Sequence, residues 1–294
     1  MNAGEQILVI GGGFGGLHAV RALKRAPVEI TLVDRENYHL FQPLLYQVAT
    51  GGLSPADIAS PLRSVLKRQR NVRTLMGEAV DIDPERRVVR LKDGRLSYDT
   101  LIVATGAHHN YFGHDEWERL APGLKTVDDA TAIRARLLSA FERAERESSP
   151  EERRALMTIV IVGGGPTGAE LAGAIAEISR DTLRQDFRAI DPAATKIILV
   201  QGGDRILPSY PEPLSREAHR ALESLGVEVR VGGFVTDVTD DGVTITRGAR
   251  TERIATRTTL WAAGVRASSF GRRLAEMTGA QVDDVGRIVI DPSL

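Results

Sequence analysis

The sequence predicts an α/β fold made of two Rossmann-like units, and two glycine-rich turns carry most of that prediction. The first turn, residues 11–16, reads GGGFGG, and the second, residues 163–168, reads GGGPTG. Each follows a short apolar run, Ile7–Ile10 or Ile159–Val162, and each opens a helical pattern. A strand, a glycine turn and a helix in this order begin a unit that binds a dinucleotide. One such motif is weak evidence, but two in matching contexts predict two nucleotide sites.

Each glycine of the G-x-G-x-x-G pattern has its own task. The first allows a tight turn, the second lets the backbone approach a pyrophosphate, and the third lets the helix pack on the strand. We expect the pyrophosphate at the helix N-terminus, where free N–H groups and the helix dipole favour an anion. The predicted cradle residues are Gly11, Gly13, Phe14, Gly15 and Gly16 in the first turn and Gly163, Gly165, Pro166, Thr167 and Gly168 in the second.

The duplication extends beyond the glycines. At a similar distance after each turn, a short apolar run ends in small residues, 104–106 (ATG) and 262–264 (AAG). Between these landmarks each half carries an Asp-Gly pair typical of a β-hairpin, at 93–94 and 241–242. The sequence therefore predicts an internal repeat of two Rossmann-like units, each with a small antiparallel β-meander insert.

Apolar periodicity and turn residues give the remaining elements. A strand Glu29–Val33 ends at Asp34, where a carboxylate can accept hydrogen bonds from ribose hydroxyls; an ordinary aspartate of a strand-end loop is the alternative. Further predicted elements are a helix from Asp57 to about Lys67, a charged amphipathic helix Asp128–Arg146, a helix from Pro166 to about Arg180, and a strand Ile197–Val200 followed by Gln201. A last apolar run covers Ile288–Ile290.

The composition excludes several classes of function. The chain has 294 residues and a net charge of −1, which gives no general attraction to nucleic acid. It shows neither a secretory leader pattern nor an apolar run of about 18 residues that could span a bilayer. It contains no cysteine, so thiol relays and thiolate metal sites are excluded on this chain, and six scattered histidines show no metal-ligand spacing. We therefore expect no metal site.

One longer segment is more specific than the glycine motifs. Residues 37–51, NYHLFQPLLYQVATG, come straight after Asp34 and resemble type II NADH:quinone oxidoreductase, the single-subunit NADH dehydrogenase that pumps no protons. The segments 110–113 (NYFG), 205–208 (RILP) and 261–265 (WAAGV) are similar to the same family. The resemblance covers nearly the whole chain, and it implies a two-dinucleotide-binding flavoprotein of the respiratory chain.

The resemblance also implies how the cofactors are shared between the two units. FAD is expected in the first turn with Asp34, the Val80 backbone region, Ala104, Thr105 and Gly106. NADH is expected in the second turn, with Gln201 at the strand end and Gly264 after the last strand of the unit. NADH would pass a hydride to FAD, and the reduced flavin would pass two electrons to a membrane quinone. Gln201 stands where the family usually has Glu, which predicts NADH as the main donor with NADPH also used.

Glu170 is the predicted catalytic residue outside the two cradles. It follows Gly168 on what we expect to be the first turn of a helix, and in similar enzymes a glutamate here lies near the nicotinamide and the flavin. The alternative is a carboxylate that only stabilises the helix N-terminus, by about 0.3–1 kcal/mol.

The resemblance also implies domain boundaries and a subcellular location. We expect residues 1–118 to form the first part of the FAD-binding domain, 119–266 the NAD(P)H-binding domain, and 267–294 a truncated return segment to the FAD domain. This family continues with membrane-docking helices, so we expect peripheral association with the cytoplasmic side of the cell membrane through a C-terminal part absent here, while this chain alone would be soluble. The oligomeric state is not decided by the sequence, and a homodimer is one alternative.

Two other readings of the function remain open. The chain could be a diaphorase or an enzyme of ferredoxin-reductase type, which passes electrons to another acceptor. It could also be a non-catalytic fragment that only binds a nucleotide. The segment 37–51 argues against the first of these.

Overall fold

Two α/β units make up the chain in a computed structural model, which describes residues 4–292. Unit 1 comprises Met1–Phe41, Ala56–His108 and Val265–Leu294, and unit 2 comprises Gln42–Pro55 and His109–Gly264. These bounds differ from the domains expected from the sequence. The segment Gln42–Pro55 lies in unit 2 because its helix α2 (Leu45–Ala49) packs on two helices of that unit.

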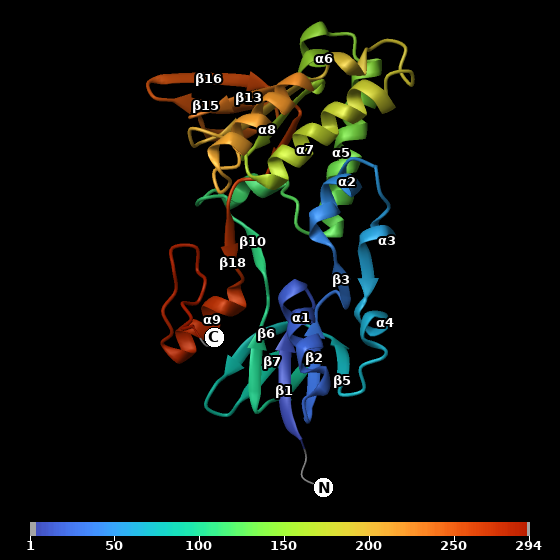
Figure 1. Cartoon of the computed structure of the whole chain (residues 1–294). Helices are drawn as coiled ribbons and strands as arrows, with labels where there is room; N and C mark the ends of the chain where they lie inside the picture. Colours follow the sequence, from blue (N-terminus) through green and yellow to red (C-terminus); the bar gives the residue numbers. More distant parts are fainter. Residues whose placement is uncertain (1–3, 293–294) are drawn as a thin grey trace. The chain divides into compact units, whose positions relative to one another are not determined.

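Unit 1 is built on a four-stranded parallel sheet in the order β5-β2-β1-β9 (Figure 1). Its strands are β1 (Glu5–Ile10), β2 (Val28–Asp34), β5 (Val72–Met76) and β9 (Thr100–Val103). Helix α1 (Phe14–Ala22) follows β1 after the turn Gly11–Gly13 and continues into a short 3-10 turn, Leu23–Arg25. The centre of β1 is almost fully buried, as a strand covered on both faces must be. The predicted strand–turn–helix unit is confirmed.

An antiparallel meander and a C-terminal helix complete unit 1. The meander consists of β6 (Ala79–Asp83), β7 (Val88–Leu91) and β8 (Gly94–Ser97), with the predicted Asp-Gly turn between its last two strands. Helix α9 (Ser269–Thr278) packs against β6, where Arg273 Nε donates to Asp81 Oδ1 at 2.8 Å. Two short strands, β10 (Ala107–His109) and β18 (Val265–Ala267), pair with each other.

One predicted element of unit 1 is wrong. The single helix from Asp57 to about Lys67 is instead α3 (Pro55–Ile58), strand β4 (Ala59–Pro61) and α4 (Leu62–Leu66). Proline lacks an N–H and pushes the residue before it toward extended backbone, so Pro61 ends the first helix and β4 pairs with β3 (Tyr38–Leu40). The apolar run at 288–290 forms only an isolated bridge between Ile288 and Val282, and Val289 and Ile290 are exposed.

Unit 2 repeats the sheet of unit 1, as predicted. Four parallel strands run in the order β13-β12-β11-β17, so the first, second, third and last strands of this sheet take the same places as those of unit 1. The strands are β11 (Thr158–Val162), β12 (Lys196–Gln201), β13 (Val227–Val231) and β17 (Thr258–Trp261). In both sheets the first strand lies between the second and the last. The point where the strand order reverses is where α/β proteins bind ligands, at the carboxyl ends of the strands.

The other elements of unit 2 lie around this sheet. A second meander consists of β14 (Phe234–Thr239), β15 (Gly242–Arg247) and β16 (Arg250–Ala255). The remaining helices are α5 (Val127–Arg146), α6 (Pro150–Leu156), α7 (Pro166–Glu177) with a π-helical end at Ile178–Thr182, α8 (Glu212–Ser224), and 3-10 turns at Gln42–Leu44, Asp115–Arg119 and Pro192–Ala194. Thr126 and Asp129 cap α5 reciprocally, which explains why the predicted helix begins where it does.

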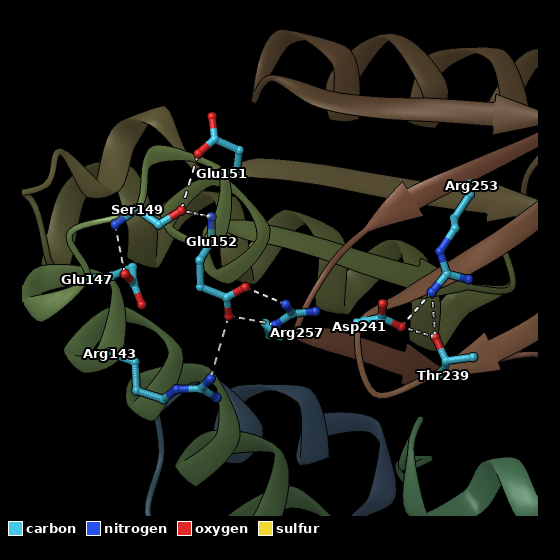
Figure 2. Close-up of polar contacts among 9 residues, drawn as sticks. All are labelled: Arg143, Glu147, Ser149, Glu151, Glu152, Thr239, Asp241, Arg253 and Arg257. Atoms are coloured by element: carbon cyan, nitrogen blue, oxygen red, sulfur yellow. Dashed lines mark hydrogen bonds and ion pairs between the residues drawn. The ribbon is translucent and has the colours of Figure 1, made fainter.

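A polar network joins α5 and α6 to the segment before β17 (Figure 2). Glu152 receives two hydrogen bonds from Arg257, one of them from Nε at 2.7 Å, and its carboxylate lies 3.8 Å from Arg143. The hydrogen bonds from Arg257 lower the pKa of the Glu152 carboxyl. A second pair, Asp241 and Arg253, lies at the meander turn.

No helix within residues 4–292 has both the length and the apolar character that crossing a bilayer requires.

Candidate functional site

The first glycine turn closes tightly and leaves the N-terminus of α1 open. Gly11 has φ +102°, a conformation that L side chains rarely adopt, and its N–H donates to Val33 O at 2.8 Å. A Cβ on Gly16 would lie 1.8 Å from Gly11 O, so the helix packs on the turn only because Gly16 has no side chain. Around Gly13 there is nothing within 4 Å of an added Cβ, and no side chain caps the helix. The first N–H groups of α1 therefore receive no hydrogen bond from a capping side chain.

Asp34 ends β2 directly beside this turn. Its Oδ2 accepts from Gly12 N at 2.6 Å, while Oδ1 accepts from Glu36 N at 2.8 Å and from Asn37 N at 2.9 Å. These bonds orient the carboxylate at the edge of the cradle, where it is half-buried. The ribose role predicted for Asp34 stays a prediction, and the position suits it.

The other residues predicted for FAD lie at the same end of the sheet or on the meander. Ala104 N donates to Ile10 O at 2.8 Å, which brings the start of 104–106 against the glycine turn. The hydroxyls of Thr105 and Ser268 are hydrogen-bonded, and Gly106 has φ +69° with open space around it. Val80 lies where the pairing of β6 with β7 shifts register, so its backbone groups are outside the regular ladder.

Phe14 presents an aromatic side chain at the mouth of the first turn. It is 39% exposed, and its ring meets His39 edge-on at a centroid distance of 4.9 Å and Phe41 at 5.7 Å. His39 Nδ1 lies 3.1 Å from Gly12 O. The segment after β2 thus returns to the glycine turn, a contact that the sequence motif alone did not predict for His39.

The second glycine turn repeats the first in unit 2. Gly163 has φ +106°, its N–H donates to Val200 O at 2.7 Å, and a Cβ on Gly168 would lie 1.8 Å from Gly163 O. Gly165 is the N-cap of α7, makes no side-chain cap bond and has open space around it. Pro166 and Thr167 are the first helical residues, and Pro suits this position because its missing N–H would have no partner in the helix.

Gln201 occupies in unit 2 the place of Asp34 in unit 1. Its Oε1 accepts from Gly164 N at 2.8 Å, as Asp34 Oδ2 does from Gly12 N. The side chain therefore lies at the end of β12 beside the second turn, which is the placement that the NADPH prediction needs. Whether it binds a ribose remains a proposal.

The loop after Gln201 is fixed to the same turn. Leu207 N donates to Gly164 O at 2.7 Å, and Leu207 has a positive φ of 48°, which a non-glycine residue rarely adopts. Arg205 uses one guanidinium nitrogen to bind Pro208 O at 3.0 Å. This contact gives Arg205 a structural role in its own loop.

Glu170 is an exposed residue of α7, but it does not lie where expected. The helix begins at Pro166 and has no acidic residue in its first turn, so Glu170 falls one residue beyond that turn. The prediction of a first-turn carboxylate is therefore wrong, and a stabilising role through the helix dipole, which fades after the first turn, loses support. Desolvation by the surrounding protein raises the pKa of the Glu170 carboxyl.

Gly264 lies next to an aromatic cluster of unit 2. It has φ +71°, and a Cβ there would lie 2.5 Å from the ring of Phe112. Buried Trp261 stacks on Tyr111 at a centroid distance of 5.0 Å and donates from Nε1 to Asn110 O at 3.0 Å. The segments 110–113 and 261–265, which carried part of the resemblance, are thus in direct contact.

Both turns fit a nucleotide pyrophosphate on steric and electrostatic grounds. In each, a side chain on the last glycine would strike the turn, the N-cap glycine leaves space in front of the helix, and no acidic residue stands in the first turn to repel an anion. The residues present in each turn therefore suit the pyrophosphate of a dinucleotide such as FAD or NADH.

The comparison with known families agrees with this geometry. Residues 5–294 match the model of the pyridine nucleotide-disulphide oxidoreductases. The chain belongs to this family. It has no cysteine, so it is a member without the thiol chemistry in the family's name.

Individual relatives confirm the resemblance drawn from segment 37–51. The type II NADH:quinone oxidoreductase Ndh of Mycobacterium tuberculosis is 46% identical over 295 residues, which cover 99% of this chain and 64% of the relative. NdhA of the same organism is also 46% identical, over 99% of this chain and 63% of its own length. The structure of NDH2 from Plasmodium falciparum in complex with NADH has a TM-score of 0.85 at 25% identity and covers 92% of this chain and 57% of that one. The chain thus spans just under two thirds of the length of these curated relatives.

Proposed function

We propose that the chain forms the nucleotide-binding part of a flavin-dependent NADH:quinone oxidoreductase, an enzyme that takes hydride from NADH and passes two electrons to a quinone. The observation that carries the proposal is the duplicated cradle. Two sheets of the same strand order each end in an open, glycine-lined helix N-terminus with a polar side chain from the second strand hydrogen-bonded beside it. The relatives at 46% identity carry this activity in their names.

The first turn would hold FAD and the second NADH. Backbone N–H groups of α1 and α7 would bind the two pyrophosphates, and Asp34 and Gln201 would bind ribose hydroxyls. Ala104, Thr105 and Gly106 would border the first cofactor, with the Val80 backbone at its far end, and Gly264 would border the second. When bound, FAD supplies the hydride-accepting chemistry, while the protein supplies position and electrostatics.

Glu170 is the side chain proposed to act near the reacting end of NADH. Its raised pKa keeps the carboxyl protonated to a higher pH than an ordinary glutamate, so it can hold a proton closer to neutral pH. No residue of the chain can form a thiol intermediate, because the chain has no cysteine.

A quinone acceptor places the reaction at a membrane. We propose peripheral association of the enzyme with the cytoplasmic face of the cell membrane, since quinones dissolve in the bilayer. Flotation with liposomes tests the association, and analytical ultracentrifugation tests a homodimer.

An acceptor assay tests the function. The purified chain is supplied with FAD and NADH, and NADH oxidation is compared with a short-chain quinone, with ferredoxin and with no acceptor. We expect quinone-dependent turnover that requires FAD. Faster turnover with ferredoxin would favour the ferredoxin-reductase class, and nucleotide binding without flavin binding would favour a non-catalytic module.

A further inference from the structure

Phe234 has a large apolar side chain that is exposed to solvent at the edge of the second nucleotide site. It is the first residue of β14, and 64% of it is exposed. Its ring lies over Gly202, where a Cβ would come within 2.6 Å of Cε1. A side chain at 202 would displace the ring, so Phe234 can take this position only because residue 202, directly after Gln201, is a glycine.

Two backbone hydrogen bonds hold the ring at this place. Gly232 N donates to Gly203 O at 2.8 Å, and Gly233 N donates to Gln201 O at 3.3 Å. The loop after β13 is thereby fastened to the loop after β12, directly before Phe234. The position of the ring relative to Gln201 is set by the backbone of unit 2.

A dinucleotide bound in such a unit would extend from the glycine turn toward this ring. The pyrophosphate sits at the helix N-terminus, and the ribose sits at the end of the second strand, here β12 with Gln201. We expect the base to continue beyond the ribose, away from the turn, toward β13, which pairs with β12, and the loop that follows it. Phe234 begins at the end of that loop.

We propose that Phe234 is the platform on which the adenine of NADH stacks. The inference rests on the proposed function, because it takes the second turn as the NADH site. An exposed aromatic face beside the ribose-binding side chain offers a flat partner for a base, and a base stacked on an aromatic side chain gains a several-fold to over 100-fold increase in affinity, about 1–3 kcal/mol.

The first unit shows that the fold itself does not require this ring. The corresponding residue of unit 1 is Glu78, which likewise follows a glycine after the third parallel strand of the sheet. Its carboxylate pairs with Lys92 Nζ at 2.5 Å. An aromatic residue is therefore a feature of the second site.

Calorimetric titration of the chain, kept in saturating FAD, with ADP-ribose tests the proposal. We expect Phe234→Ala to weaken ADP-ribose binding about tenfold, and Phe234→Tyr and Phe234→Trp to retain it. Phe234→Leu keeps the apolar contact with Gly202 but lacks an aromatic face, and we expect it to behave like the alanine variant. Leu214→Ala, at another exposed apolar residue of unit 2, is the control and should bind as the parent does.

A second readout separates stacking from a structural role. Reduced nicotinamide mononucleotide lacks adenine, so it should reduce the flavin of the Phe234 variants as fast as that of the parent. The KM of the variants for NADH should rise. Equal losses with both donors, or unchanged ADP-ribose binding in Phe234→Leu and Phe234→Ala, would overturn the inference and leave the proposed function standing. A parent chain that binds no ADP-ribose would contradict the NADH site itself.

Discussion

At the scale of single residues, the polar side chain at the end of the second strand differs between the two units. Asp34 carries a charge and Gln201 does not, although both accept a hydrogen bond from the glycine turn at a similar distance, 2.6 and 2.8 Å. A carboxylate beside the ribose repels the extra phosphate of NADPH, because two unit charges about 4 Å apart interact by about 4 kcal/mol at an effective dielectric near 20. A neutral amide removes that repulsion.

We therefore predict that the chain uses NADPH as well as NADH, and that Gln201→Glu removes NADPH use. The variant should lower kcat/KM for NADPH by tenfold or more and change the value for NADH little, since a carboxylate still accepts from ribose hydroxyls. Steady-state kinetics with both donors measure this. If the parent rejects NADPH as strongly as the variant does, Gln201 does not contact the ribose.

Glu170 is the residue whose charge state we expect to matter for turnover. Since desolvation raises its pKa, the carboxyl loses its proton at a higher pH than a free glutamate, and a limb of the pH–rate profile should lie above the ordinary glutamate range. Glu170→Gln preserves the shape and removes this ionisation. We predict lower quinone turnover and loss of that limb, with unchanged ADP-ribose affinity. A variant equal to the parent in both half-reactions would show that Glu170 has no catalytic role.

The sequence predicted the glycines and strand-end residues because their chemistry is set by local backbone geometry. It did not predict His39 beside the first turn or Phe234 beside the second, because both reach their sites only through loop contacts from residues distant in the sequence. The sequence did not predict the positive φ of Leu207 either, since leucine is not a residue type that favours the left-handed region.

At the scale of elements, the ion pair between α6 and the segment before β17 fastens two parts of unit 2 (Figure 2). The side chains of Glu152 and Arg257 are only 26% and 23% exposed, and Arg257 Nη1 is buried without a hydrogen-bond partner. Removal of Glu152 would leave a partly buried guanidinium with even fewer acceptors.

We predict that Glu152→Gln lowers the free energy of unfolding by about 1.5–3 kcal/mol, the range for a hydrogen bond to a charged group. Because the pKa of Glu152 is lowered, its contribution is present above the unfolded pKa of a glutamate and is lost as the pH falls through the folded value. Urea unfolding at neutral and acidic pH measures both effects. The control is Glu151→Gln on the same helix, whose pair with Arg154 is 75% and 70% exposed and should matter little. Equal effects of the two substitutions would contradict the assignment.

Helices and hairpins with strong periodicity, clear capping or a turn motif were predicted correctly. Elements that form because a strand pairs with a distant segment were not. The helix at 127–146 and both Asp-Gly hairpins follow from local signals. The segment 55–66 breaks into three pieces because Pro61 and the pairing with β3 override its helical composition. No local signal specifies that partner strand.

At the scale of the whole molecule, the chain combines two nucleotide cradles with a sequence free of cysteine. The proposed electron transfer must then proceed without a thiol intermediate. We predict that thiol-alkylating reagents leave NADH oxidation unchanged within error when the chain is assayed with FAD and a quinone. Inhibition by such a reagent, traced by mass spectrometry to a residue of the chain, would show that another nucleophile is essential.

In the proposed enzyme, FAD occupies the first turn and NADH the second. An anaerobic titration of the FAD-supplied chain with NADH, followed through the visible flavin absorbance, tests it most directly when combined with Gly16→Ala and Gly168→Ala, since a Cβ at either position would strike the turn at 1.8 Å. We predict that NADH bleaches the flavin in the parent, that a quinone restores the absorbance, that Gly16→Ala loses bound flavin, and that Gly168→Ala keeps flavin but is not reduced by NADH. A folded Gly168→Ala that loses flavin while Gly16→Ala retains it would contradict the account.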